Sequence, residues 1–327
     1  MKKIFIFIIL ISFESFGKSN DKPNLNFSQN NEISWEEWIK EIKFKYKDDF
    51  SEKTLNYLDK ISLNKRVIEL DRKQPEFTLT FNEYFKKHIS KKKIEQIKKK
   101  YNKNNNLLSK IEQKYQVDRK IIVSLWGIET SFGNYLGKFD ILRSLASLAY
   151  DGRRRVFFLN ELNKALLILD KNHVSIERFK GSWAGAFGQT QFMPSTFTRY
   201  AVDFDNNKKI DLFSKIDALG SAANYLAEEG WNKNLVWGEK VNLKINDKFK
   251  LMAKKKVYKS IKYWENNGFM LRKNYNKSDK LRLIIPDSVD NQVFLVSKNF
   301  DVILKWNRSN YFALTVFLLS DEIDKNI

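Results

Sequence analysis

Glu129 lies at the C-terminal end of a predicted helix (117–133) whose inner face is otherwise apolar. Ile122, Leu125 and Trp126 precede it on that face, at the i, i+3, i+4, i+7 spacing of an amphipathic helix. Burial of a carboxylate there would raise its pKa and keep it protonated near neutral pH, as a general acid requires. Glu129 is therefore the candidate catalytic acid. The alternative is a glutamate at a helix end whose carboxylate simply reaches water.

The second stretch whose residues could bind a ligand or carry chemistry is a glycine-rich segment, GSWAGAFGQTQFMPS (181–195). Its three glycines, within eight residues, allow tight turns and a close approach of backbone to a ligand. Aromatic and polar residues alternate between and after them: Trp183, Phe187 and Phe192 with Ser182, Gln189 and Gln191. That mixture suits a carbohydrate, which has apolar ring faces and hydroxyl edges. A purely structural loop is the alternative, and the glycine spacing matches neither a Walker loop nor a dinucleotide-binding fingerprint.

A third segment has the oxygen-donor spacing of a calcium loop. Positions 1, 3, 5 and 7 of an EF-hand-like loop are filled by Asp203, Asp205, Asn207 and the carbonyl of Lys209. Two features depart from the pattern, since position 6 is Lys208 instead of glycine and position 12 is Ser214 instead of glutamate.

The elements that must position these residues are predicted to be mostly helical. The expected mainly α fold has a helical core over about 107–235, a small β-rich part over about 238–306 and a C-terminal helix over 310–322. Within the β-rich part, short apolar runs predict strands at 241–245, 249–253, 281–285, 292–296 and 302–306.

Composition narrows the classes of protein further. The 327 residues are 43% hydrophobic and 30% charged, which is typical of a globular chain. The absence of cysteine excludes disulfides, thiolate metal sites, cysteine nucleophiles and a lipid attached through cysteine. With only His88 and His173, a poly-histidine metal site is excluded as well.

The N-terminus has the layout of a secretory signal. Lys2 and Lys3 precede a ten-residue, nearly wholly apolar run and then small and polar residues, so residues 1–17 are predicted to be a signal peptide and 18–32 a loose segment. An uncleaved anchor or a buried helix is the alternative. Export would direct the positive charge, formally +20 for the full chain, toward anionic wall polymers and lipid headgroups instead of nucleic acid. The lysine-rich stretch 86–103 is then either a solvated helix face or a landing surface for an anionic polymer.

Three long segments closely resemble the lytic murein transglycosylase B family. They are WGIETSFG (126–133), GSWAGAFGQTQFMPSTF (181–197) and AVDFDNNKKIDLFSKIDALGSAANYLAEEGW (201–231). Two flanking segments, QPEFTLTFNEYF (74–85) and NFDVILKWNRSNYFALTV (299–316), are similar to the family in the same order. The resemblance implies a lysozyme-like helical core with a small β-containing insertion, in an enzyme that cuts the glycan strands of peptidoglycan.

The resemblance also implies roles for individual residues. Glu129 matches the family's single catalytic acid. Positions that bind substrate are matched by Ser182, Gln191, Tyr84, Tyr225, Arg154, Arg155, Asn307 and Tyr311. Trp306 and Phe312 stand where the family usually has tyrosines, and Arg153 stands where it has proline. Asp217 would complete a structural calcium site with Asp203, Asp205, Asn207 and Lys209.

The expected function is therefore that of a lytic transglycosylase, which needs no cofactor for its chemistry. It would cleave the β-1,4 bond after N-acetylmuramic acid and leave 1,6-anhydromuramic acid ends. Peptidoglycan strands are the expected partner, with cell-wall synthesis complexes as further candidates. The alternatives are a lysozyme-type hydrolase, for which no second acid stands out among Asp140, Asp151 and Glu161, and a catalytically weak wall-binding protein.

Overall fold

The computed structural model describes residues 33–73, 79–242, 245–287 and 292–325. The chain forms two compact units, one from residues 1–75 and 129–221 and the other from 76–128 and 222–327. Two helices, α7 (Arg119–Thr130) and α11 (Lys215–Glu228), contain residues of both units. The predicted signal peptide (1–17) and the segment 18–32 lie outside the described residues. None of the helices in the described ranges combines the length and apolar character needed to cross a membrane.

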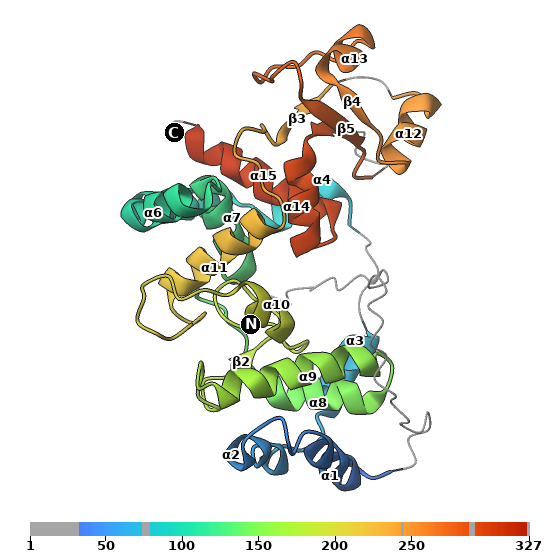
Figure 1. Cartoon of the computed structure of the whole chain (residues 1–327). Coiled ribbons are helices and arrows are strands. Elements are labelled where there is room, and N and C mark those ends of the chain that lie inside the picture. Colours follow the sequence, from blue (N-terminus) through green and yellow to red (C-terminus); the bar gives the residue numbers. More distant parts are fainter. Residues whose placement is uncertain (1–32, 74–78, 243–244, 288–291, 326–327) are drawn as a thin grey trace. The chain divides into compact units, whose positions relative to one another are not determined.

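The first unit is built on a helical hairpin. Its elements are α1 (Trp35–Lys45), α2 (Glu52–Leu55), the 3-10 turn Leu58–Lys60, α3 (Lys65–Arg72), β1 (Phe139–Asp140), α8 (Ile141–Asp151), α9 (Arg155–Asp170), β2 (Lys180–Gly181) and α10 (Pro194–Tyr200). Helices α8 and α9 lie side by side (Figure 1). Asp140 caps α8 by accepting from the Arg143 amide at 2.7 Å, and Gly152 ends it with φ +85°. Leu145 and Phe158 are fully buried in this unit.

A buried carboxylate ties α3 to the start of α9. Asp71 is 1% exposed, and its Oδ2 accepts from Nε of Arg153 at 2.8 Å. Its other oxygen pairs with Arg154, whose guanidinium also lies over the Phe158 ring, 4.7 Å from its centroid. A buried carboxylate is tolerated only where such partners replace its lost hydration. Asp71 is thus a structural anchor of the first unit.

The second unit combines helices with one sheet. Its elements are α4 (Phe81–His88), α5 (Lys91–Lys103), α6 (Asn105–Tyr115), β3 (Gly238–Val241), α12 (Asp247–Lys254), β4 (Tyr258–Ser260), α13 (Ile261–Asn266), β5 (Lys280–Ile284), β6 (Val293–Val296), α14 (Lys298–Trp306) and α15 (Asn310–Asp324). The antiparallel sheet has the order β3-β6-β5-β4, with Leu295 opposite both Glu239 and Leu283. Trp264, fully buried, donates its indole N–H to the Leu281 carbonyl at 3.0 Å and fills the core beside this sheet.

Two of the predicted strands are wrong. Residues 249–253 lie within α12, because the Asn246 side chain accepts from the Phe249 amide at 3.0 Å and caps a helix there. Residues 302–306 lie within α14, where Phe300 and Ile303 bury the same helix face despite the β-branched residues of the run. The helix expected over 310–322 is α15.

Loss of the Asp71 anchor should strongly destabilise the first unit. Asp71→Ala is expected to lower the free energy of unfolding by about 3–5 kcal/mol, because it leaves Arg154, only 12% exposed, without its carboxylate. Urea denaturation measures the change. Asp59→Ala is the matched control, since Asp59 pairs with Lys43 at the surface and exposed pairs contribute about 0–1 kcal/mol. Equal effects of the two substitutions would contradict the anchor.

Candidate active site

Glu129 occupies the last turn of α7, in the environment that the sequence predicts. The helix starts after Asp118, whose Oδ1 accepts from the Lys120 amide at 2.8 Å. Ile122 and Leu125 are fully buried and Trp126 is 3% exposed, so the predicted face points inward. Glu129 itself is only 8% exposed. Its carboxyl is thus largely removed from bulk water, as the sequence predicts.

The backbone beyond Glu129 turns sharply and is fixed to the glycine-rich segment. Ser131, Phe132 and Gly133 follow α7 in left-handed conformations, with φ of +50°, +64° and +81°. Thr130 holds this turn: its Oγ1 donates to the Gln189 carbonyl at 2.8 Å and accepts from the Gly133 amide at 3.0 Å. Thr130, the residue next to the candidate acid, therefore connects the end of α7 to the 181–195 loop.

That loop is a tightly folded hairpin that carries both predicted polar binding residues. Ser182 pairs with Ala186 twice, its amide donating to the Ala186 carbonyl at 2.7 Å and its Oγ accepting from the Ala186 amide at 3.0 Å. Gln191, at φ +52°, donates through Nε2 to the carbonyls of Gly188 at 2.9 Å and Leu136 at 3.2 Å. A Cβ added to Gly181 would lie 2.1 Å from the Ala186 carbonyl oxygen, so the tight turn of the hairpin requires glycine there, while the predicted close approach to a ligand stays a prediction.

The aromatic residues of this loop do not form a sugar platform. Trp183, Phe187 and Phe192 are 7%, 1% and 3% exposed. The Phe187 ring packs edge-on against Phe179, with centroids 4.9 Å apart. The three rings fill the core of the first unit, and carbohydrate binding by this loop stays a prediction. Ser182 and Gln191, both partly exposed, remain the loop's candidates for substrate contact.

The two arginines predicted to bind substrate make structural contacts in this unit. Arg154 pairs with Asp71, and Arg155 donates to the carbonyls of Ala149 and Tyr150, each at 3.3 Å. Arg153, in the place of the family's proline, also binds Asp71. Substrate binding by Arg154 and Arg155 stays a prediction.

The remaining residues predicted to bind substrate belong to the second unit, where the tyrosines among them lie in two aromatic groups. Tyr84 lies beside Tyr311, with ring centroids 5.5 Å apart, and the Tyr311 hydroxyl donates to Oδ2 of Asp287 at 3.4 Å. Tyr225 meets Trp306 edge-on at 5.0 Å. Asn307 follows Trp306 at the end of α14, and its Oδ1 accepts from the Ser309 amide at 3.1 Å. Trp306, a tyrosine position in the family, thus still places an aromatic ring against Tyr225.

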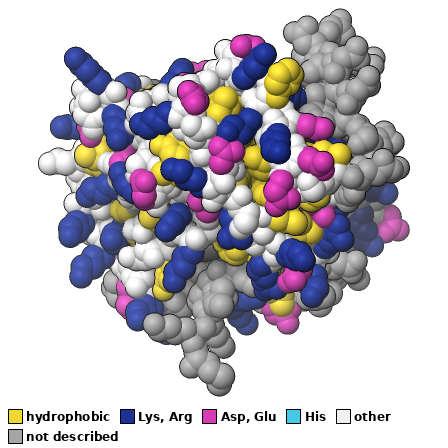
Figure 2. All heavy atoms as spheres, turned by 90° about the horizontal axis from the view of Figure 1, so that it is seen from below, with side chains coloured by type: hydrophobic (Ala, Val, Ile, Leu, Met, Phe, Trp, Pro, Cys, Tyr) yellow, Lys and Arg dark blue, Asp and Glu magenta, His cyan; other side chains and the backbone are white. Residues whose placement is uncertain are grey.

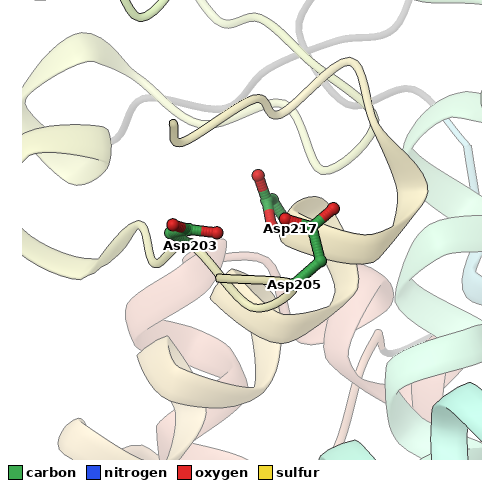
Figure 3. Close-up of side chains that lie close together, drawn as sticks. All are labelled: Asp203, Asp205 and Asp217. Atoms are coloured by element: carbon green, nitrogen blue, oxygen red, sulfur yellow. The ribbon is translucent and has the colours of Figure 1, made fainter. Parts of the chain in front are cut away.

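The predicted calcium loop brings three carboxylates together (Figure 3). Oxygens of Asp203, Asp205 and Asp217 all lie within 4.8 Å of one another. The loop closes through backbone amides, with the Asp203 oxygens accepting from Asn207 at 3.0 Å and Lys208 at 2.6 Å. Lys208 adopts φ +69°, the conformation for which EF-hand loops use glycine at this position.

Electrostatics make this cluster receptive to a cation. Asp217 is fully buried, and burial raises its pKa, with the nearby Asp205 and Asp203 charges adding to the effect. Both Asp217 oxygens accept backbone amides, from Phe204 and Asp211, each at 2.8 Å. Arg178 pairs with the neighbouring Asp211 at 3.2 Å. Hard oxygen donors at this spacing fit a calcium ion.

Two parts of the site have no signal in the sequence read along the chain. Thr130 and Gln189 are joined across 59 positions, and nothing in either segment predicts the other as its partner. Asp287 accepts from the Phe81 amide at 2.7 Å across 206 positions, which fixes the start of α4 and hence Tyr84.

Comparisons with known proteins agree with this architecture. Residues 34–321 match the transglycosylase SLT domain family. Over 245 residues the chain is 32% identical to membrane-bound lytic murein transglycosylase B of Escherichia coli (strain K12), which covers 73% of this chain and 66%, just under two thirds, of that protein.

Solved structures confirm the predicted mainly α, lysozyme-like fold. SltB3 from Pseudomonas aeruginosa, in complex with NAG-NAM-pentapeptide, is 33% identical with a TM-score of 0.85, covering 90% of this chain and 80% of that one. Escherichia coli Slt35 in complex with calcium is 28% identical with a TM-score of 0.74, covering 88% and 92%.

Removal of the Thr130 hydroxyl should shift the position of Glu129 without changing Glu129 itself. Thr130→Val keeps the side-chain shape but leaves the Gln189 carbonyl and the Gly133 amide without their partner. We expect about 1–3 kcal/mol of lost stability and, because a shift of about 1 Å can cost ~100-fold in rate, a fall in activity of at least ~10-fold. Thr198→Val is the control, since that hydroxyl is exposed and bonds its own helix at Ser195. Full activity of Thr130→Val would disprove the link.

Proposed function

The chain belongs to the transglycosylase SLT domain family, and we propose that it is a peptidoglycan lytic transglycosylase that uses Glu129 as its only catalytic acid and base. The observation that carries this assignment is the burial of Glu129 at the end of α7, next to the fixed turn at Thr130. SltB3, the solved relative with NAG-NAM-pentapeptide bound, supports the same substrate class here.

The reaction requires one group that first gives and then takes a proton. Protonated Glu129 would donate to the oxygen that joins N-acetylmuramic acid to N-acetylglucosamine, and the bond from that oxygen to C1 would break. The resulting carboxylate would accept the proton of the muramyl C6 hydroxyl while O6 bonds to C1. A 1,6-anhydromuramyl end forms, and no water is consumed. Ser182 and Gln191, on the loop joined to α7 through Thr130, are the residues we assign to holding the sugar.

A lysozyme-type hydrolase would need a second carboxylate to activate water. The three carboxylates considered for that role in the sequence analysis make structural contacts instead. Glu161 is 1% exposed and accepts from both the amide and the hydroxyl of Ser195, at 2.9 and 2.6 Å. Asp140 caps α8, and Asp151 pairs with Arg72 at 2.5 Å. This arrangement favours the anhydro product over hydrolysis.

The place of action that fits this substrate is the periplasm. The pattern of residues 1–17 supports export, and the curated relative in Escherichia coli is named as membrane-bound. Peptidoglycan strands are the proposed partner, and complexes of cell-wall synthesis are a further candidate. The proposal places the enzyme where its polymeric substrate lies.

We also propose that the loop from Asp203 to Asp217 binds calcium as a structural ion. The three carboxylates, with Asn207 and the Lys209 carbonyl, would hold it, and the ion would cancel the repulsion between their charges. Asp217 would take the place of the distal acid, because Ser214 accepts from the Ile216 amide at 3.3 Å at the start of α11. Binding would stiffen the connection from the glycine-rich loop to α11.

Analysis of digestion products tests the enzymatic proposal. Purified sacculi incubated with the protein should release muropeptides lighter by one water than lysozyme products, because the C6 hydroxyl replaces water as the nucleophile. Mass spectrometry separates the two. Glu129→Gln should lower turnover by at least ~10²-fold while retaining the fold and binding. Reducing muramic ends as the main product, or a Glu129→Gln variant with more than a tenth of the activity, would refute the mechanism.

Thermal unfolding tests the metal proposal. Calcium should raise the Tm and a chelator lower it, by mass-action linkage to the folded state. Because the raised pKa of Asp217 favours its protonated form, we expect the calcium-induced shift to grow as the pH rises through that pKa. Asp203→Asn should abolish the shift. Asp247→Asn, at an exposed carboxylate on α12, is the control and should leave it unchanged. An unaltered Tm with chelator would show that the loop closes without an ion.

A further inference from the structure

The outer face of α5 is an unneutralised lysine surface. Its exposed residues are Lys91, Lys92, Glu95, Gln96, Lys99, Asn102 and Lys103, which at 100° per residue occupy one continuous side of the helix. The last turn of α4, just before it in the chain, adds the exposed Lys86 and Lys87. We call these six lysines the α5 lysine face. Among the exposed residues of α5 there is one acidic residue, Glu95, and no arginine.

These lysines differ from the paired ones elsewhere in the protein. Within the described ranges none of the six forms an ion pair, whereas Lys43, Lys120 and Lys273 each bind an aspartate. On the face of the molecule that Figure 2 shows, Lys and Arg side chains are spread over the surface with Asp and Glu between them. The α5 lysine face instead concentrates positive charge that the protein itself does not neutralise.

The opposite side of α5 is fully used by packing. Ile97 is completely buried, Lys93 donates to the Gly127 carbonyl of α7 at 2.5 Å, and Lys100 lies over the Trp126 ring, 5.6 Å from its centroid. A helix that lies on a membrane needs an apolar face to insert, and α5 has none left outside. Its outer face fits a hydrated polyanion better than a lipid bilayer.

We propose that the α5 lysine face binds the carboxylates of the peptide stems of peptidoglycan and holds the enzyme on its insoluble substrate. The inference rests on the proposed function and adds the chemical group that the polymer offers. Lysine is a flexible point charge that does not require the planar geometry arginine selects, so it suits carboxylates at irregular spacing. Such a surface retains the protein near the polymer while allowing it to move along it.

Co-sedimentation with purified sacculi tests the proposal, with Glu129→Gln in the full chain to prevent digestion. The triple change Lys92→Gln, Lys99→Gln and Lys103→Gln should weaken binding at least ~5-fold at low ionic strength. The difference should nearly vanish at about 0.3 M salt, where charges are screened within a few ångströms. Sacculi whose carboxyl groups have been converted to amides, which leaves the cross-links intact, should show no difference between the triple variant and its parent.

A matched control separates this face from net charge. Lys254, Lys255 and Lys256, exposed at the end of α12, allow a second triple change to glutamine with the same loss of charge. It should change binding less than ~2-fold. With Glu129 restored, both triple variants should cleave a saturating concentration of a short soluble muropeptide with the parental kcat, which also shows that they fold.

Three outcomes would overturn the inference. Equal losses from the two triple changes would assign the effect to net charge, and no loss from the α5 change would remove the face from binding. A loss of binding to phosphatidylglycerol vesicles that exceeds the loss on sacculi would assign the face to membranes. A parent protein that binds sacculi through α5 but never releases anhydro products would refute the proposed function and leave this inference standing.

Discussion

The hydrogen bond from Thr130 Oγ1 to the Gln189 carbonyl is the constraint on which the first unit's site depends. An α-helix ends with unsatisfied carbonyls and a chain free to leave in many directions. Here three successive residues in the left-handed conformation follow the helix. Residues other than glycine keep this conformation only when the surrounding structure holds them in it. Thr130 stabilises the turn through the two hydrogen bonds of its hydroxyl, to the Gln189 carbonyl and from the Gly133 amide. The same bond fixes the glycine-rich loop, so the acid and its neighbouring polar residues are positioned by one contact.

The site illustrates a division between residues that carry chemistry and residues that carry the fold. Glu161, Asp140 and Asp71 are buried or half-buried carboxylates, yet each is satisfied by amides, hydroxyls or guanidinium groups of its own unit. Such groups stabilise the fold because their lost hydration is replaced. What distinguishes Glu129 is its place at the end of an apolar helix face, beside a fixed turn. The proposed catalytic role of Glu129 therefore rests on its burial together with its position at this turn of the backbone.

Charge is used in two different ways in this basic protein. Inside the units, acids and bases are arranged in specific contacts, such as Asp301 with the buried Arg282 at 2.5 Å. The cluster at Asp217 differs, because three carboxylates converge there and form the proposed calcium site. Outside, on α5, positive charge is left unpaired at the surface. The paired charges within the units stabilise the fold. The carboxylates near Asp217 and the lysines of α5 are the groups for which we propose ligands from solution.

Much of the protein was determined by the sequence itself. The apolar periodicity of 117–133 located Glu129, the glycines located the loop, and the oxygen spacing located Asp203 and its neighbours, because each of these signals is local. Tertiary structure alone decided which loop rings are buried, that Arg154 binds Asp71, and that 249–253 and 302–306 are helical. It also chose the partners of Thr130 and of Asp287, at separations of 59 and 206 residues. The physical reason is that local patterns encode which face of a helix is buried, whereas the group that meets it is selected only when distant segments fold together.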